Sequence, residues 1–353
     1  MKDLIKTTAI FTLLVIIIPM LSFLNPNQIS AQYDDNNLPA ENQNTTTNFY
    51  DSDNQIASPT DDIVIYDDIN KTLSYDGLDE FKVLDYTSGQ VYTITMLDYV
   101  IGAVLAEMPA TFHEEALKAQ AICAHTYAIR QMEKQLLSPD NELLGAYISN
   151  DSTKYQAFFT KEQAKSFYGD AYDEYYTKVF IAVTEVISKV LYYDDEPIVA
   201  AFHSTSSGRT ESAEVIWGSE IEYLIPVDSS FDENSPSFLE EKEFTSDEIS
   251  SLLKAYYPNI SLEKKVSKWL DIIERSDTGT VTKIKTGDIE IHGTKLRSIL
   301  NLRSANFDIE YDTDKDQFTI TTKGYGHGVG LSQYGANTLA NDGYTYDEIL
   351  YHY

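Results

Sequence analysis

Cysteine is almost absent from this chain of 353 residues, and positive charge is scarce. The single cysteine, Cys123, excludes a disulfide within the chain and a cysteine-rich metal site, and its alanine-rich surroundings predict a small buried hydrophobe. Only 26 Lys and Arg accompany 56 Asp and Glu, which gives a formal net charge of −30. Because nucleic-acid binding requires a basic surface that neutralises phosphates, we expect no nucleic-acid partner.

Lysine and arginine are missing altogether between Lys6 and Lys71. An apolar run at residues 9–24 follows Lys2 and Lys6, a pattern that inserts into a membrane with its basic end in the cytoplasm. Residues 1–24 are therefore expected to form a membrane anchor or a signal segment. Ile29–Ala31 is a poor signal-peptidase site, and the sequence leaves both alternatives open. Either one places the bulk of the protein outside the cytoplasm.

Apolar side chains are also rare in residues 25–61, where Asn, Asp, Gln, Thr and Ser dominate. Such a segment cannot bury enough apolar surface to fold, so we expect a flexible acidic tether. The folded part is expected to span residues 62–353, which is long enough for an ample core.

Hydrophobic patterning in the folded part predicts an α+β fold, with antiparallel hairpins and packed helices that form a substrate cleft. Residues 175–190 fit a helix, or a helix that runs into a strand, and residues 198–202 fit a buried strand that ends at His203. The remaining elements are predicted as hairpins at 81–95, 269–285 and 307–321, and as helices at 97–107, 113–136 and 247–257, the last with Ser246 as its N-cap.

Glu107 departs from the default of a solvated surface carboxylate. It follows a seven-residue apolar run in the segment Tyr99–Pro109, and the apolar positions recur at helical spacing. A short buried helix should therefore place this carboxyl group against apolar side chains, and Pro109 should end the helix. Burial raises the pKa of a carboxyl group, so Glu107 can hold a proton near neutral pH, as a general acid must.

The alanine-rich segment Glu115–Ala128 predicts a second, closely packed helix. Lys118 and His125 are seven residues apart, which is two turns, and so share a face, whereas Gln120 lies roughly opposite them.

Two further segments carry polar and glycine-rich motifs. His203–Gly208 has no Gly-x-Ser-x-Gly elbow for a nucleophilic serine, and a turn after a buried strand is the plainer interpretation. Glycines alternate from Gly324 to Gly330 around His327, without the lysine and hydroxyl residue of a nucleotide-binding loop. In an extended strand this spacing would leave one face of the strand without side chains, so that a ligand or another backbone segment could approach closely.

Four segments together resemble the stage II sporulation protein D and amidase-enhancer family: Tyr99–Pro109, Glu115–Ala128, Ala201–Glu211 with Glu214 and Trp217–Gly218, and Gly324–Ala336. The resemblance runs from about Val91 to the C-terminus, in the same order. It implies that residues 62–353 are a catalytic domain and that Glu107 is its catalytic residue. It also implies that the substrate-binding residues are Lys118, Gln120, His125, His203, Ser204, Ser206, Gly208, Thr210, Trp217, His327 and Gln333.

This sequence departs from the family pattern at two places. The family often has Arg where this chain has His125, so His125 is either a titratable glycan contact or a buried helix histidine. Some members carry a zinc-binding segment where this chain has Asn150–Gln156, with Lys154 and Tyr155 in place of the ligands. We therefore expect neither a metal nor any other cofactor.

The resemblance implies a peptidoglycan lytic transglycosylase that cleaves the MurNAc–GlcNAc bond and leaves 1,6-anhydro-MurNAc ends. The implied setting is the septal and engulfing membrane of a sporulating cell, with a single membrane pass and the catalytic domain outside. The implied partners are glycan strands and the stage II sporulation proteins M and P. A non-catalytic enhancer of a partner amidase is the alternative, and hydrolysis with Glu211 or Glu214 as a second carboxylate is a weaker one.

Overall fold

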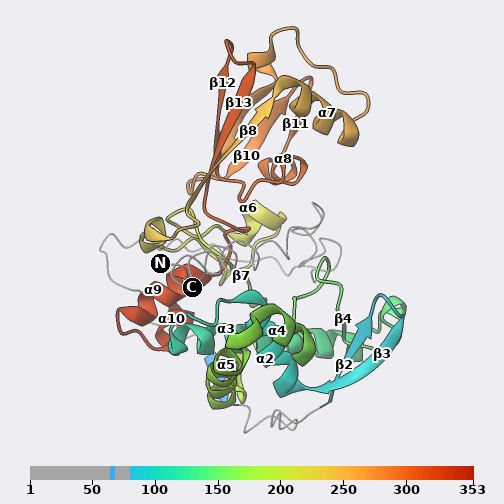
Figure 1. Ribbon diagram of the computed structural model, residues 1–353, viewed down its shortest axis with the longest axis vertical. Helices are drawn as coiled ribbons and strands as arrows, with labels where there is room; N and C mark the ends of the chain where they lie inside the picture. Colours follow the sequence, from blue (N-terminus) through green and yellow to red (C-terminus); the bar gives the residue numbers. More distant parts are fainter. Residues whose placement is uncertain (1–63, 68–79) are drawn as a thin grey trace.

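The computed structural model describes residues 64–67 and 80–353, so the predicted membrane segment (1–24) and tether (25–61) lie outside the described residues. Figure 1 shows a mainly helical part and, above it, a mainly β part. Each part has its own hydrophobic core. The mixed α+β class, with small sheets and antiparallel hairpins, is confirmed.

The helical part is built around one long helix, α3 (Glu114–Leu137). Helices α2 (Met96–Glu107) and α5 (Tyr172–Val186) lie against it, and so do α9 (Gln333–Asn341) and α10 (Tyr346–His352) from the end of the chain. Alanines 116, 119, 121, 124 and 128 of α3 are fully buried, and their small side chains let the other helices approach on several sides. The short helix α4 (Lys161–Tyr168) completes this layer.

Short strands border the helical part. A sheet of order β3-β2-β4 combines the hairpin β2 (Glu80–Asp85) and β3 (Gln90–Thr95) with β4 (Ile148–Ser149). A second sheet has the order β1-β5-β6, with strands β1 (Val64–Asp67), β5 (Lys189–Tyr193) and β6 (Glu196–Pro197). A third sheet consists of two short parallel strands, β7 (Phe202–His203) and β14 (Leu331–Ser332).

The β part contains two three-stranded antiparallel sheets with helices α7 (Ser246–Tyr256) and α8 (Gly293–Leu300) against them. Helix α6 (Ala213–Trp217) lies between the two parts (Figure 1). The sheets have the orders β11-β10-β9 and β12-β13-β8, with strands β8 (Leu239–Thr245), β9 (Leu270–Arg275), β10 (Val281–Thr286), β11 (Ile289–Ile291), β12 (Phe307–Asp312) and β13 (Gln317–Lys323).

Most predicted elements are confirmed, and three details are wrong. Residues 198–201 are buried but form no strand, because the Ala201 amide bonds the Val199 carbonyl and turns the backbone; only Phe202 and His203 pair, with β14. The N-cap of α7 is Thr245, in a capping box with Glu248, and not Ser246.

The third difference is the glycine-rich segment, which is a loop and not an extended strand. Gly324, Gly326, Gly328 and Gly330 have φ values of 76°, 122°, 87° and 67°, a region that favours glycine. A Cβ atom on Gly326 would lie 2.6 Å from the His203 Cβ, and one on Gly330 would lie 2.4 Å from the Ala201 carbonyl oxygen. The expected close approach of another backbone segment is therefore found.

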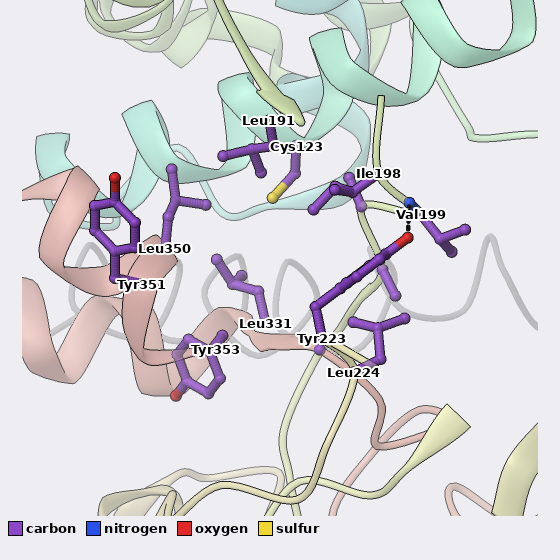
Figure 2. A pocket seen from close by; sticks show the side chains of 13 residues that line it. Cys123, Leu191, Ile198, Val199, Tyr223, Leu224, Leu331, Leu350, Tyr351 and Tyr353 are labelled. Atoms are coloured by element: carbon purple, nitrogen blue, oxygen red, sulfur yellow. Dashed lines mark hydrogen bonds between the residues drawn. The ribbon is translucent and has the colours of Figure 1, made fainter. Parts of the chain in front are cut away.

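An apolar cavity of about 40 Å³ lies between α3, α10 and residues 198–201 (Figure 2). The thiol of Cys123 is directed into it, and the Tyr223 hydroxyl beside it accepts a hydrogen bond from the Val199 amide. Burial raises the pKa of Cys123 to about 12, which confirms the prediction of a small buried hydrophobe.

In residues 64–67 and 80–353, no helix is both long enough and apolar enough to cross a membrane.

Gly102 of α2 provides a test of this packing. Its Cβ, if present, would lie 2.3 Å from the Phe159 carbonyl oxygen, and its own carbonyl accepts a hydrogen bond from the Phe159 amide. Helix propensity alone favours Gly102→Ala by about 1 kcal/mol, but the overlap should reverse the sign and destabilise the fold by roughly 1–3 kcal/mol. Chemical denaturation measures the change, with Ser251→Ala on the exposed face of α7 as the control. A stabilised Gly102→Ala protein would contradict the packing.

Candidate active site

Glu107 is the last residue of α2, and its position follows from how this helix begins and ends. The Thr95 side chain caps the N-terminus by accepting a hydrogen bond from the Asp98 amide. Nine residues of the helix are buried, and the backbone at Met108 is then extended before Pro109. The Glu107 side chain itself is partly exposed. A carboxyl group is therefore held at the end of an apolar helix, within reach of solvent.

The Glu107 carboxyl group is held by the segment after β4. The Ala157 amide donates to Glu107 Oε1 at 3.0 Å. The preceding residue, Gln156, is buried; its side-chain oxygen accepts from the Tyr99 hydroxyl at 3.0 Å, and its amide donates to the Tyr127 hydroxyl oxygen at 3.3 Å. These hydrogen bonds fix the backbone that holds the carboxyl group.

The backbone of Glu107 is held from the opposite end of the chain. Gln333, the first residue of α9, donates from Nε2 to the Glu107 carbonyl oxygen at 3.0 Å and to Gln120 Oε1 at 3.2 Å. The Glu107 carbonyl is one of the groups that a helix C-terminus leaves without a partner inside the helix. Gln120 and Gln333 are both buried; Gln333 bonds the backbone of Glu107, and Gln120 bonds Gln333.

The surroundings of Glu107 raise its pKa to about 7. Desolvation is the main cause, since it penalises the carboxylate form, and the hydrogen bond from Ala157 opposes it. Tyr99 and Tyr127, the titratable neighbours, have pKa values raised mainly by burial, so they stay neutral. A carboxyl group with this pKa can donate a proton at neutral pH and take it back afterwards.

Lys118 and His125 share a face of α3, as predicted, and that face is turned toward α5 and β5. Lys118 Nζ lies 2.8 Å from Glu115 Oε1 and 2.7 Å from Glu185 Oε2. Burial lowers the pKa of Lys118, but these two carboxylates outweigh that effect and raise it. Lys118 is therefore a charged but already paired side chain.

His125 is buried, with Nδ1 3.0 Å from the Lys189 carbonyl oxygen. Burial lowers the pKa of the imidazole to about 4, so the ring is neutral at physiological pH. This arrangement matches the alternative of a buried helix histidine and not that of a cationic glycan contact. Gln120, on the opposite face, accepts a hydrogen bond from Gln333, which in turn bonds the Glu107 carbonyl oxygen.

His203, His327 and Trp217 form an aromatic cluster. The ring centroids of His203 and His327 are 5.7 Å apart, and those of Trp217 and His327 are 5.5 Å apart. Burial lowers the pKa of His203 to about 4. Burial also lowers the pKa of His327 well below its usual value, and the neighbouring His203 and Arg297 lower it further. His327 and Trp217 are partly exposed, so the cluster offers neutral rings to the surface.

The polar residues after β7 mostly bond within the protein. Ser206 Oγ accepts from the Gly208 amide at 3.1 Å, and Thr210 Oγ1 accepts from the Val227 amide at 2.7 Å. Ser206, Gly208 and Thr210 are buried, whereas Ser204 is partly exposed. Of the predicted substrate contacts, the side chains with some exposure are Lys118, Ser204, Trp217 and His327.

The two candidate second carboxylates differ from Glu107. Glu211 is buried and accepts hydrogen bonds from the Ser276 hydroxyl at 2.6 Å, the Thr278 hydroxyl and the Ser212 amide. It joins the Gly-rich loop to the β9–β10 turn, since its amide also bonds the Gly328 carbonyl. Glu214 lies exposed in the first turn of α6.

The segment Asn150–Gln156 holds no metal-ligand cluster, and no group of three or more His, Cys, Asp or Glu suited to a metal occurs in the described part of the chain. Lys154 is exposed and Tyr155 is partly exposed. The residues that sequence reasoning missed are Tyr99, Tyr127, Gln156 and Ala157. Tyr99 and Tyr127 lie in the recognised segments, but nothing in the pattern indicated that both bond to Gln156.

Comparisons with known proteins show which family this chain resembles. A family model described as a stage II sporulation protein matches residues 85–193, and a domain of unknown function matches residues 205–330. The chain is 38% identical over 265 residues to stage II sporulation protein D of Bacillus subtilis (strain 168), covering 74% of each chain. It is 37% identical to the protein of that name from Bacillus amyloliquefaciens, covering 74% of this chain and 73% of the relative. It is also 28% identical to the amidase enhancer of Bacillus subtilis (strain 168), covering 71% of this chain and 39% of that relative.

The raised pKa of Glu107 should make the fold less stable as pH rises. Between the unfolded value near 4.5 and the folded value of about 7, the unfolded chain loses a proton that the folded chain keeps, so stability falls across that window. Glu107→Gln removes this effect. The variant should match the wild type in stability at pH 4 and exceed it by on the order of 2–3 kcal/mol at pH 8, as measured by denaturant unfolding. Equal stability at both pH values would mean that Glu107 titrates normally.

Proposed function

Because the chain belongs to the stage II sporulation protein D family, we propose that it is a peptidoglycan lytic transglycosylase with Glu107 as its catalytic residue. The bond cleaved is the MurNAc–GlcNAc glycosidic bond, and the product end is 1,6-anhydro-MurNAc. The observation that carries the proposal is the position of the Glu107 carboxyl group at the accessible end of the apolar helix α2, where desolvation raises its pKa to about 7.

The mechanism needs one carboxyl group that acts twice. Protonated Glu107 donates its proton to the glycosidic oxygen, which leaves with the bonding electron pair as the GlcNAc hydroxyl. The substrate's acetamido group assists at the anomeric carbon. The Glu107 carboxylate then takes the proton of the muramic acid 6-hydroxyl, whose oxygen bonds the anomeric carbon and closes the ring. The internal nucleophile gains the advantage of an intramolecular reaction, and Glu107 ends protonated for the next cycle.

The environments of Glu211 and Glu214 favour this mechanism over hydrolysis with a water nucleophile. Hydrolytic glycosidases generally use two carboxyl groups that flank the scissile bond. Glu211 is buried and accepts hydrogen bonds from the protein itself, and Glu214 lies exposed on α6. Among the partly exposed predicted contacts, Ser204, Trp217 and His327 supply a hydroxyl group and aromatic rings of the kind that bind sugars.

A non-catalytic enhancer of a partner amidase is the second candidate. The similarity to the amidase enhancer of Bacillus subtilis supports it. In that case the same surface would bind glycan strands, and Glu107 would serve in binding or folding alone. The two candidates differ in a single observable, which is whether the purified protein cleaves strands without a partner.

The proposed setting is the outer side of the cytoplasmic membrane in a sporulating cell, at the septal and engulfing membrane. The name of the relatives supports sporulation. The apolar run at residues 9–24 supports an anchor, and the charge distribution after it supports a tether. The stage II sporulation proteins M and P are the proposed protein partners, and the glycan strand is the proposed substrate.

Glu107→Gln should abolish strand cleavage while the protein still folds and binds glycan. Gln keeps the shape and the bond from Ala157 but has no titratable proton, so the loss would be chemical. Purified glycan strands, with and without stem peptides, are incubated with each protein, and the products are identified by mass spectrometry. Anhydro ends identify a transglycosylase and reducing ends a hydrolase.

Glu214→Gln is the matched control, because it removes an exposed carboxyl group outside the proposed mechanism. Its activity should stay within about twofold of the wild type. No cleavage by the wild-type protein on any strand would favour the enhancer. Near-normal cleavage by Glu107→Gln would remove Glu107 from the mechanism.

The proposed topology predicts that protease added to intact protoplasts removes the folded domain. The basic end of the apolar run should stay in the cytoplasm, so residues after it should be accessible from outside. Immunoblotting of the domain measures the loss, and a cytoplasmic protein in the same sample should stay intact. A fully protected domain would contradict the topology.

A further inference from the structure

The segment from Gln156 to Phe159 runs along α2 and is fixed to the helices at several points. At one end, the Phe159 amide bonds the Gly102 carbonyl at 3.0 Å. In the middle, the Phe158 ring lies 5.2 Å from the Tyr99 ring between centroids. At the other end, Gln156 bonds the hydroxyl groups of Tyr99 and Tyr127.

These contacts place the Ala157 amide, which bonds the Glu107 carboxyl group. Ala157 follows Gln156 directly, and a planar peptide group links them, so an orientation fixed at Gln156 is passed on to the Ala157 amide. Tyr99 belongs to α2 and Tyr127 to α3. Gln156 therefore ties the Ala157 amide both to the helix that carries Glu107 and to the helix beside it.

We propose that Tyr99, Tyr127 and Gln156 are positioning residues that hold the Ala157 amide on Glu107 and thereby set the geometry and the ionisation of its carboxyl group. None of the three needs to touch the substrate: Tyr99, Tyr127 and Gln156 are all buried. The expected change in rate rests on the proposed function, in which Glu107 is the catalytic residue. The expected change in the ionisation of Glu107 does not depend on any activity.

The surroundings of Glu107 make the expected direction of change definite. The titratable groups that interact with it are Tyr99 from α2 and Tyr127 from α3, both neutral, and α9 contributes the neutral amide of Gln333. The hydrogen bond from Ala157 favours the carboxylate form and opposes desolvation. Weakening that bond should therefore raise the pKa of Glu107 above its value of about 7.

Tyr127→Phe and Tyr99→Phe each remove one hydroxyl group that bonds Gln156 and leave the ring in place. The pKa of Glu107 should rise by roughly half a unit or more in each variant. Because both act through Gln156, the double variant should shift it by less than the sum of the two. Carbon-13 NMR of protein labelled at the glutamate carboxyl carbon follows the titration, and the signal absent from Glu107→Gln identifies Glu107.

Tyr168→Phe is the matched control. Tyr168 is also buried, and its hydroxyl donates to the Leu105 carbonyl of α2 at 2.7 Å. In the described part of the chain its hydroxyl and ring contacts are with Leu105, Phe167 and Tyr175, and none is with residues 156–159. It should lose stability comparably while the pKa of Glu107 stays at the wild-type value. A thermal melt of each variant shows that the comparison is made on folded protein.

In strand cleavage, Tyr127→Phe should lower kcat roughly ten- to a hundredfold with little change in KM, because a misplaced acid is inefficient but no substrate contact is lost. The alkaline limb of its pH profile should move upward, whereas that of Tyr168→Phe should not. An unchanged or lowered pKa of Glu107 in both Tyr127→Phe and Tyr99→Phe would overturn the proposal. Absence of cleavage by the wild type would instead refute only the proposed function, since the NMR titration does not depend on it.

Discussion

The packing of small side chains around α3 is the constraint on which the rest of this structure depends. Helices α2, α5, α9 and α10 lie against α3, and they can do so because alanines cover several of its faces. This fixes how the helix is rotated about its axis, so that Lys118 and His125 face α5 and β5 while Gln120 faces α9. A bulkier residue at these alanine positions would separate α2 and α9, and the contact between Gln333 and Glu107 would be lost.

The sequence predicts the local elements of this fold well and their mutual contacts poorly. Periodicity placed both helices around Glu107 to within about a residue, and alternation placed three hairpins. It also identified Lys118 and His125 as neighbours on one face. Periodicity contains no information on which element covers that face. Whether His125 is a surface cation or a buried ring therefore depends on β5, whose Lys189 carbonyl oxygen lies 3.0 Å from its Nδ1.

The same limit explains why the contact between Tyr127 and Gln156 was not predicted, and why residues 324–330 are a loop where an extended strand was considered. Tyr127 and Gln156 are 29 residues apart and meet only through tertiary packing. Alternating glycines are compatible with a strand or with a loop of positive φ, and the backbone that approaches them, residues 201–211, decides between the two. Glu107 could be identified as the candidate acid because its sequence pattern is local: a carboxyl group directly after an apolar helical run and shortly before a proline.

The C-terminal helices have a consequence for the order in which the chain can fold. Leu331, Leu339 and Ile349 belong to the same core as α2 and α3, and Gln333 supplies the bond to the Glu107 carbonyl. A ribosome has synthesised more than three hundred residues before these side chains exist. Until then the core around α2 and α3 is incomplete and part of its apolar surface is exposed, as in a folding intermediate. Because Gln333 supplies the bond to the Glu107 carbonyl oxygen, a product that ended before residue 333 would lack that bond.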